Sequence, residues 1–251
     1  MTVFLSVVIP AYNEEARIGV ALEKVRAYLE HQPYSSEVIV VENGSTDRTA
    51  AIVETAAAQP GVPVRLLRLD RAGKGRAVRA GMLAAVGEYR FFADADLSMP
   101  IEQLARFLPP AIGAADLAIG SREAPGARRI GEPAYRHIMG RVYNLIIRLV
   151  AVNGFDDTQC GFKMFRGEAA DWLFRHQLID GWAFDIELLL LAKRRGYRIV
   201  EVPIDWYHGE QSKVRPVRDT VTMLGETLKI RLNVLRGRYP AREQSTSPGA
   251  Q

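Results

Sequence analysis

Short apolar runs alternate with segments of helical periodicity along the first half of the chain. Five of these runs have the length and composition of β-strands, and they cover residues 3–9, 37–41, 64–69, 89–93 and 116–119. Between the first two, Ile18, Leu22, Val25 and Leu29 recur at steps of three or four residues, which places them on one face of a helix. A similar stripe over residues 74–86 predicts a second helix. This alternation predicts an α/β fold with a mainly parallel central sheet and helices on both faces.

Polar clusters follow three of the predicted strands. The first strand runs into Pro-Ala-Tyr-Asn-Glu-Glu at residues 10–15, the second into Glu-Asn-Gly-Ser-Thr-Asp at 42–47, and the fourth into Asp-Ala-Asp at 94–96. The first two clusters are also typical of turns, since asparagine caps helices and Asn-Gly favours a turn. However, the carboxyl ends of parallel strands meet at one edge of the sheet, where ligands of α/β proteins bind. Three acid-bearing strand ends at that edge therefore predict a binding site.

Asp94 and Asp96 form the most informative of these clusters, because they are separated by a single residue. Two carboxylates so close repel each other unless a cation lies between them. Magnesium binds to proteins through one or two carboxylates together with the phosphates of a substrate. The pair therefore predicts a divalent metal ion that contacts a diphosphate.

The charge of the chain is mild in total but unevenly distributed. The 251 residues have a net charge of +4, whereas residues 193–242 alone contain twelve basic and five acidic side chains, a net +7. This indicates an anionic partner (phosphate, nucleic acid or an acidic lipid surface) unless it is a solvated helix face. Aromatic residues do not interleave with the basic ones as on a single-strand nucleic-acid platform, so we expect no nucleic-acid partner. The single cysteine, Cys160, fits a reducing, cytoplasmic compartment, and we expect it to be a packed residue.

Further polar motifs follow the strand-end clusters. They are Gly-Lys-Gly at 73–75, Gly-Ser-Arg at 120–122, Asp-Thr-Gln-Cys-Gly-Phe-Lys at 157–163, Trp-Ala-Phe-Asp-Ile-Glu at 182–187 and Ser-Lys at 212–213. In order and spacing, the motifs over residues 3–215 resemble the family 2 glycosyltransferases, and within them the dolichyl-phosphate glucosyltransferase and mannosyltransferase group. Residues 158–163 and the Ser-Lys pair look more like the glucosyl branch. The resemblance implies the GT-A nucleotide-sugar fold, an inverting transfer reaction and a bound Mg²⁺ or Mn²⁺.

The resemblance also implies roles for individual residues. The residues that contact the nucleotide sugar are then Pro10, Ala11, Tyr12, Glu14, Glu42, Asn43, Ser45, Lys74, Asp94, Ala95 and Asp96. Asp94 is expected to face the ribose and the metal, and Asp96 to coordinate the metal on the donor diphosphate. Glu42 stands where the family usually has the aspartate that binds uracil.

The acceptor decides which other side chains the chemistry needs. A sugar hydroxyl needs a carboxylate base, whereas a phosphomonoester is already largely a dianion at neutral pH and needs cations to position it. The candidate cations are Arg122, Arg129 and Lys213, with Arg128 equally compatible with a surface loop. The candidate catalytic acids are Asp96, Asp157 and Asp185, of which Asp185 is expected to be a base or orienting group on the acceptor side.

We predict a single domain over residues 1–240, with a nucleotide-sugar half (1–120), an acceptor half (121–240) and a disordered tail (241–251). Two segments of the acceptor half, about residues 134–152 and 217–236, are basic and amphipathic. The apolar stripe of the second consists of Val217, Val221, Leu224, Leu228, Leu232 and Leu235. Such a stripe usually packs onto the domain, but it also allows a helix to lie in a membrane interface.

No segment approaches the roughly 20 apolar residues of a membrane span. We therefore expect a cytoplasmic protein that binds the membrane surface peripherally, either directly or through a partner membrane protein. The predicted reaction is the metal-dependent transfer of glucose from UDP-glucose to a polyprenyl phosphate. The alternatives are a GDP-mannose-dependent mannosyltransferase, a family 2 enzyme with a soluble acceptor, and a non-catalytic nucleotide-sugar-binding module. The intact Asp94 and Asp96 disfavour the last of these.

Overall fold

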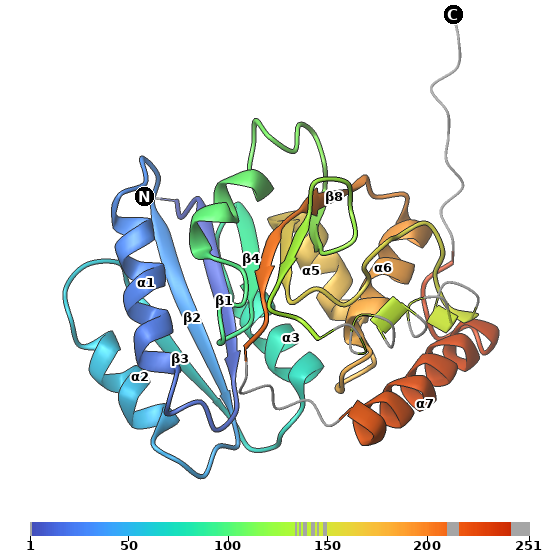
Figure 1. Ribbon diagram of the computed structural model, residues 1–251, viewed down its shortest axis with the longest axis horizontal. Helices are drawn as coiled ribbons and strands as arrows, with labels where there is room; N and C mark the ends of the chain where they lie inside the picture. Colours follow the sequence, from blue (N-terminus) through green and yellow to red (C-terminus); the bar gives the residue numbers. More distant parts are fainter. Residues whose placement is uncertain are drawn as a thin grey trace, which may run out of the picture.

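A seven-stranded sheet runs through the centre of the computed structural model (Figure 1), with the strand order β3-β2-β1-β4-β7-β5-β8. The structure describes residues 2–133, 135, 137, 140, 141, 144, 146, 147, 150–209 and 216–241, the side chains of 216–219 excepted. The strands are β1 (Leu5–Ala11), β2 (Ser36–Asn43), β3 (Val64–Leu69), β4 (Tyr89–Ala93), β5 (Leu117–Ser121), β7 (Phe162–Arg166) and β8 (Ile199–Pro203). All five predicted strands are confirmed to within two residues at either end.

The prediction of a mainly parallel sheet is also confirmed. Pairing is parallel throughout, except that β7 runs antiparallel to both of its neighbours, β4 and β5. The amino end of β7 therefore lies at the same edge as the carboxyl ends of the other strands, with Phe162 opposite Ala93. This reversal brings residues just before β7 to the predicted binding edge.

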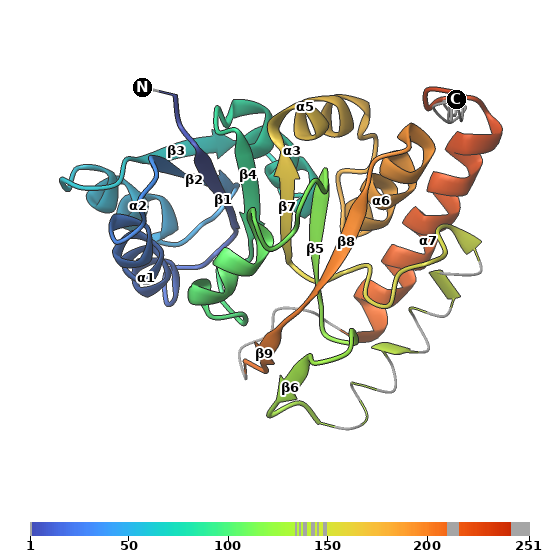
Figure 2. The same ribbon diagram turned by 90° about the horizontal axis from the view of Figure 1, so that it is seen from above.

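Two hydrophobic cores cover the two faces of the sheet. One face packs against α1 (Ile18–Glu30), α2 (Thr49–Ala57) and the 3-10 helix η1 (Ile101–Phe107), and the other against α3 (Lys74–Ala84), α5 (Gly167–His176) and α6 (Phe184–Arg195). The first two sequence-predicted helices correspond to α1 and α3. In Figure 2 the α1–α2 layer and the α3–α5 layer lie on opposite sides of the sheet.

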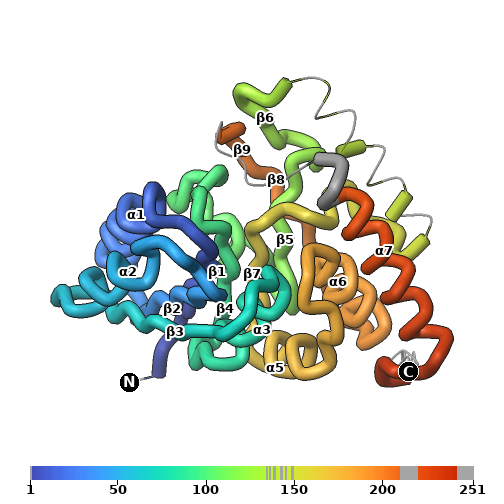
Figure 3. Tube along the Cα trace, turned by 90° about the horizontal axis from the view of Figure 1, so that it is seen from below, coloured from blue at the N-terminus to red at the C-terminus, as the bar shows by residue number. Residues whose placement is uncertain are grey.

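The acceptor half adds a small sheet and a long helix. β6 (Arg128–Ile130) pairs in parallel with β9 (Asp205–Tyr207), and α7 (Pro216–Leu235) packs against α6. Figure 3 shows α7 along the flank of the molecule farthest from α1 and α2. Among the described residues, no helix combines the length and the apolar character needed to cross a bilayer.

The orientation of α7 corrects one expectation. Of the apolar stripe of residues 217–236 that was expected to pack onto the domain, Leu224 is partly buried against the core, whereas Val221, Leu228, Leu232 and Leu235 are exposed. The buried side chains of this helix include Ile230, Thr227 and Asn233, at 0, 1 and 2 % exposure. The physical reason is that the packing of Ile230 against the core and the polar contacts described below hold this other face inward. Much of 134–152, the side chain of Val217, and residues 242–251 of the predicted tail lie outside the described residues.

Candidate functional site

The loops after β1 and β2 form one hydrogen-bonded unit at the predicted edge. Ala11 and Glu42 are paired in register, so the two loops begin side by side. The Asn13 amide donates to Ser45 Oγ at 3.0 Å, and Asn13 Oδ1 accepts the Thr46 amide at 2.8 Å. Asn13 has a φ of 53°, a left-handed conformation that asparagine tolerates better than most residues. Asn13 and Ser45 therefore fix the conformation of the two loops at this edge of the sheet.

The glutamates and Asn43 in these loops also make structural contacts. Glu14 pairs with Arg17 at 2.6 Å, and Glu42 Oε1 accepts the backbone amide of Ser45. Asn43 is 4 % exposed, and its Nδ2 donates to a backbone carbonyl of the Gly-Lys-Gly loop at 3.5 Å. The predicted nucleotide contacts of these side chains remain predictions.

Tyr12 projects from the same edge. Its side chain is 44 % exposed, whereas the preceding strand residues are buried. An exposed aromatic ring at a strand end offers a flat face to a nucleobase. Its predicted place in the nucleotide site is compatible with this position.

The acidic cluster lies directly after β4. The Asp94 amide donates to the Gly161 carbonyl at 3.1 Å, which ties the end of β4 to the residues before β7. Asp96 Oδ1 accepts the Ser98 amide at 3.0 Å, and Leu97 between them has a φ of 45°. Ala95 is 5 % exposed and packs inward. The backbone is thus folded tightly so that two carboxylates follow a buried strand.

Gly161 makes room for Asp94. A Cβ atom at residue 161 would lie 1.8 Å from Asp94 Oδ2, a distance at which one of the two groups must move. The φ of Gly161 is not in the left-handed region, so the glycine is required here for space and not for backbone conformation. Sequence reasoning included Gly161 in a motif but did not predict this contact.

Lys74 completes the acidic cluster. Its Nζ lies 2.7 Å from Asp94 Oδ1, and it also lies over the rings of Phe92 and Trp182, at 5.5 and 5.3 Å. Burial raises the pKa of Asp94, and the Lys74 ammonium lowers it only in part. Burial opposes the charge of Lys74, but the carboxylates of Asp94 and Asp185 raise its pKa above the ordinary value. The sequence-predicted Lys74, Asp94 and Asp96 are therefore together in the structure.

The Gly-Lys-Gly loop is held by the segment between α5 and α6. The Gly75 amide donates to the Gly181 carbonyl at 3.1 Å, and Gln177 Nε2 donates to the Gly75 carbonyl at 3.0 Å. A Cβ atom at Gly75 would approach the Ile179 carbonyl to 2.7 Å. This close docking of backbones explains the second glycine and positions Lys74.

A second charged pair lies at the end of β5. Arg122 Nε and Nη2 donate to the Asp157 carboxylate at 2.6 and 3.0 Å, and its backbone amide donates to the same carboxylate. Burial alone would raise the pKa of Asp157, but the Arg122 guanidinium lowers it to about 2. The guanidinium also lies 5.5 Å from the ring of Trp206.

Arg129 is another residue of the predicted acceptor clamp. Its guanidinium is 6.0 Å from Trp206, and it pairs with Glu123 at 2.6 Å and with Glu132 at 2.5 Å. Arg128 pairs with Asp205 on the surface. Arg122 and Arg129 therefore both lie near one tryptophan ring, and each already has carboxylate partners. Their predicted acceptor role remains a prediction. Lys213 lies outside the described residues.

Lys163 is a charged residue of the site that sequence reasoning did not single out. It is 1 % exposed, although it is a lysine within β7, and its Nζ lies 2.8 Å from Asp185 Oδ1. It also donates to the Cys160 carbonyl. Burial raises the pKa of Asp185, and Lys163 lowers it in part. The signal for a buried lysine in the sequence is its place in the otherwise apolar run Phe-Lys-Met-Phe at residues 162–165.

Glu187 lies on a different face of α6 from Asp185 and has a structural role. It accepts the amides of Leu178 and Ile179, both at 2.9 Å, and the hydroxyl of Tyr239 at 2.5 Å.

Cys160 is buried and burial raises its pKa to about 12, so the prediction of a packed thiol is confirmed.

Asp94 and Asp96 fit a metal ion that takes its other ligands from a substrate. Among the described residues, no group of three or more His, Cys, Asp or Glu side chains is arranged to hold a metal ion. Two carboxylates are, however, the number that magnesium uses beside phosphate oxygens. The described contact of Asp96 uses Oδ1, so its Oδ2 would be the cation ligand, whereas Asp94 has Oδ1 on Lys74 and Oδ2 against Gly161 and would share its carboxylate between Lys74 and the cation.

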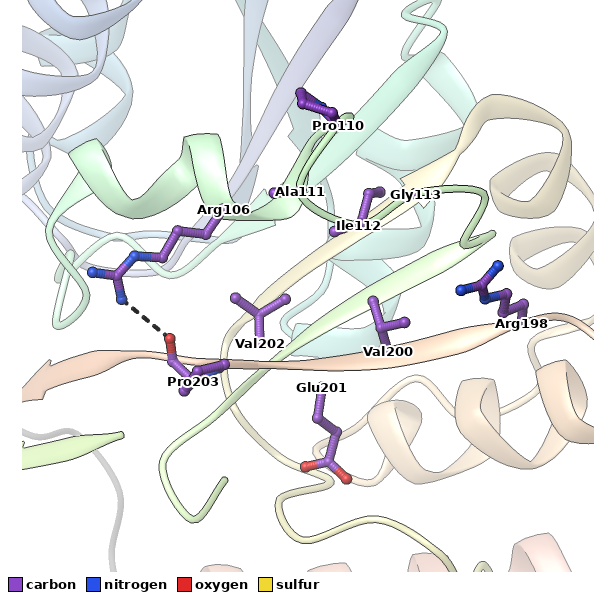
Figure 4. A pocket seen from close by; sticks show the side chains of 10 residues that line it. All are labelled: Arg106, Pro110, Ala111, Ile112, Gly113, Arg198, Val200, Glu201, Val202 and Pro203. Carbon is purple, nitrogen blue, oxygen red and sulfur yellow. Dashed lines mark hydrogen bonds between the residues drawn. The ribbon is translucent and has the colours of Figure 1, made fainter. Parts of the chain in front are cut away.

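A recess on the edge strand β8 lies apart from these residues (Figure 4). Its volume is about 570 Å³, and its apolar floor includes Val200 and Val202. Arg106 lies at one end, where it donates to the Pro203 carbonyl at 3.2 Å, and Arg198 lies at the other. It contains none of the sequence-predicted site residues, so we do not assign the donor or acceptor to it.

Several known proteins are similar to this chain over most of its length. A dolichyl-phosphate beta-glucosyltransferase of Trichomonas vaginalis is 35 % identical, over 98 % of this chain and 76 % of the relative. The dolichyl-phosphate beta-glucosyltransferase of Homo sapiens is 34 % identical, over 94 % of this chain and 77 % of the relative. That of Saccharomyces cerevisiae is 30 % identical, over 94 % and 77 % respectively.

Solved structures confirm the predicted GT-A fold. Glucosyl-3-phosphoglycerate synthase from Mycobacterium tuberculosis, in complex with uridine diphosphate, has a TM-score of 0.66 at 20 % identity and covers 91 % of this chain and 80 % of that chain. Its complex with Mn²⁺, UDP-glucose and phosphoglyceric acid has a TM-score of 0.64 at 19 % identity, over 91 % and 79 % respectively. The sequence model described as Glycosyl transferase family 2 matches residues 6–174. With two thirds of its length inside that match, the chain belongs to glycosyl transferase family 2.

Proposed function

We propose that this glycosyltransferase moves glucose from UDP-glucose to the phosphate of a polyprenyl phosphate, with inversion at the anomeric carbon. The observation that carries the proposal is the identity of 30–36 % to dolichyl-phosphate beta-glucosyltransferases along more than nine tenths of the chain. The grouping of Lys74, Asp94 and Asp96 at one strand end supports a donor that carries a diphosphate.

The donor side needs positive charge at the leaving group. Asp94 and Asp96 would hold Mg²⁺ or Mn²⁺, which when bound stabilises the diphosphate as a Lewis acid. Lys74 would supply a second cation beside the same phosphates. Its position is maintained by two aromatic rings and by the docked Gly-Lys-Gly loop, so it requires little reorganisation when the donor binds.

The acceptor side needs orientation more than a base. A phosphomonoester is largely a dianion at neutral pH and is itself the nucleophile. The described contacts of Arg122 use Nε and Nη2, so its Nη1 can donate to an acceptor oxygen beside Trp206. Asp185, at 3 % exposure and paired with Lys163, is better suited to holding Lys163 than to accepting a substrate proton.

We place the reaction at the cytoplasmic face of a membrane, with the protein bound peripherally. The lipid of the proposed acceptor keeps its phosphate at a bilayer surface. The basic composition of residues 193–242 supports contact with anionic headgroups.

The test is a transfer assay with radiolabelled UDP-glucose or GDP-mannose, polyprenyl phosphate, and Mg²⁺, Mn²⁺ or excess chelator. We expect label from UDP-glucose alone to enter the organic phase, and chelator to abolish it. Asp96→Asn should reduce transfer at least about 100-fold. The matched control is Asp70→Asn, the same chemical change at an exposed surface aspartate, which should leave the rate unchanged.

Other outcomes would contradict separate parts of the proposal. Lipid label from GDP-mannose would reassign the donor. Label transferred only to a soluble phosphate such as phosphoglycerate would reassign the acceptor. Undiminished transfer by Asp96→Asn in the presence of the metal would exclude the proposed metal site.

A further inference from the structure

The outward face of α7 carries an apolar stripe that is exposed in the described part of the chain. Val221, Leu228, Leu232 and Leu235 are exposed by 65, 57, 47 and 73 % respectively. They follow at steps of seven, four and three residues, so they form one line along the helix. We call these four residues the α7 stripe. Exposed leucines are common singly, but a line of them marks an interaction surface.

A buried isoleucine, Ile230, and several polar contacts hold α7 in this orientation. Glu226 Oε2 accepts the Ala183 amide at 2.8 Å. Asn233 Nδ2 donates to the Tyr239 hydroxyl at 3.3 Å, and that hydroxyl donates to the buried Glu187. Rotating the helix to bury its leucines would break these bonds and leave buried polar groups without partners, which is costly. The exposure of the stripe is therefore a stable property of the fold.

Basic side chains flank the stripe. Lys229, Arg231, Arg236 and Arg238 are all exposed. The only acidic side chain between residues 220 and 241 is Glu226, which is engaged with the domain. Over residues 220–241, where the side chains are described, an apolar line with a basic border and a single, engaged acid matches the interface of a bilayer that contains anionic lipid.

This charge pattern selects among possible occupants. A second copy packed stripe to stripe would bring two sets of four cations together, which is unfavourable unless anions intervene. An anionic bilayer instead accepts the leucines among its acyl chains and the cations among its headgroups. We propose that the α7 stripe docks this protein on the surface of an anionic bilayer, with the helix lying in the interface.

The docked helix would also place the site beside the lipid. Gly181 packs so closely against Glu226 that a Cβ atom there would lie 1.8 Å from Glu226 Oε1. Trp182 follows Gly181 and lies 5.3 Å from Lys74 Nζ. Helix α7 therefore contacts, through its inward face, the same loop that borders Lys74, so a bilayer on its outward face lies on the side of the molecule next to that loop. This last step rests on the proposed function, whereas the docking does not.

The test is co-sedimentation of the full chain with vesicles of phosphatidylcholine, with and without phosphatidylglycerol. We expect retention on the anionic vesicles and little on the neutral ones. The double variant Leu228→Gln/Leu232→Gln should lose about tenfold or more in vesicle affinity, because each buried leucine contributes on the order of a factor of ten. The matched control is Val20→Gln/Val86→Gln, two residues exposed by 56 and 64 % outside α7, which should bind as the unmodified protein does.

Two further readouts separate docking from folding and from catalysis. Thermal unfolding should be unchanged in the stripe variant, and so should transfer to a short-chain polyprenyl phosphate in solution, whereas transfer to acceptor embedded in vesicles should fall with vesicle affinity. Equal sedimentation of the stripe variant and its parent would overturn the proposal. A dimer in light scattering that dissociates only in the stripe variant would also overturn it, in favour of a second copy. Failure of the unmodified protein to use any polyprenyl phosphate would contradict the proposed function and leave the vesicle result standing.

Discussion

Gly161→Ala is the most direct test of how the acidic cluster is built. An alanine Cβ at this position would lie 1.8 Å from Asp94 Oδ2 and 2.4 Å from Asp94 Cγ, whereas side-chain contacts below 3.0 Å are essentially never seen. The carboxylate must therefore retreat by more than 1 Å, which also breaks its 2.7 Å contact with Lys74. The backbone needs no adjustment of φ.

The expected consequence is a loss of transfer with little loss of stability. A misplacement of about 1 Å in a group that positions a substrate costs on the order of 100-fold in rate. Because Asp94 is at a strand end, with a side chain 29 % exposed, the retreating carboxylate can turn toward solvent at a cost of about 1 kcal/mol. The assay is UDP-glucose-dependent transfer beside thermal unfolding of the same preparation.

Gly19→Ala is the matched control. Its Cβ would meet only Ile52 Cγ2, at an ordinary contact distance of 3.5 Å, inside α1. We expect it to leave transfer unchanged and to stabilise the helix by up to about 1 kcal/mol. If Gly161→Ala retained transfer within threefold of the parent, Asp94 would not need its observed position and the geometry of the donor site would be wrong.

Three further predictions concern the buried charges. Lys163→Met should lower the free energy of unfolding by about 3 kcal/mol, because it leaves Asp185 buried without its cation. Adding Asp185→Asn should restore part of this loss. Urea unfolding of the single and the double variant measures the two effects. Asp157 has its pKa lowered to about 2, so the stabilisation by its ion pair is complete above about pH 4 and is lost as pH falls toward 2. The difference in unfolding free energy between parent and Asp157→Asn should therefore shrink by about 2 kcal/mol across that window. Tyr239→Phe should cost about 1–2 kcal/mol by removing a hydrogen bond to Glu187, without changing the rate of transfer.

Each of these has a result that would contradict it. Equal destabilisation by Lys163→Met and by the double variant would mean that the buried charge is not the cause. A constant difference between pH 4 and pH 2 would mean that Asp157 titrates normally. A slower transfer rate in Tyr239→Phe at unchanged stability would assign the Glu187 cluster a part in the reaction.

The sequence alone determined the architecture and the residues of the proposed donor site. Strand periodicity predicted five strands of the sheet within two residues, because alternating apolar runs and helical stripes are local patterns. The chemistry of the Asp94–Asp96 pair and of Lys74 was also readable, since strand ends of a parallel sheet share one edge. These features depend only on residues that are near in sequence or on the topology that the alternation imposes.

Tertiary structure alone decided which side chains meet and which face of α7 is exposed. Gly161 restricts the position of the Asp94 carboxylate, and Lys163 pairs with Asp185. Both contacts exist only because β7 runs antiparallel beside β4 and brings residues 160–163 to the predicted binding edge. The stripe of α7 is typical of a packed helix in sequence, yet the buried Ile230 and the polar bonds of Glu226 and Asn233 hold another face of the helix inward and leave four stripe residues exposed. A pattern of hydrophobic residues records that a face will be covered, but what covers it depends on contacts between elements far apart in the chain, which local periodicity does not contain.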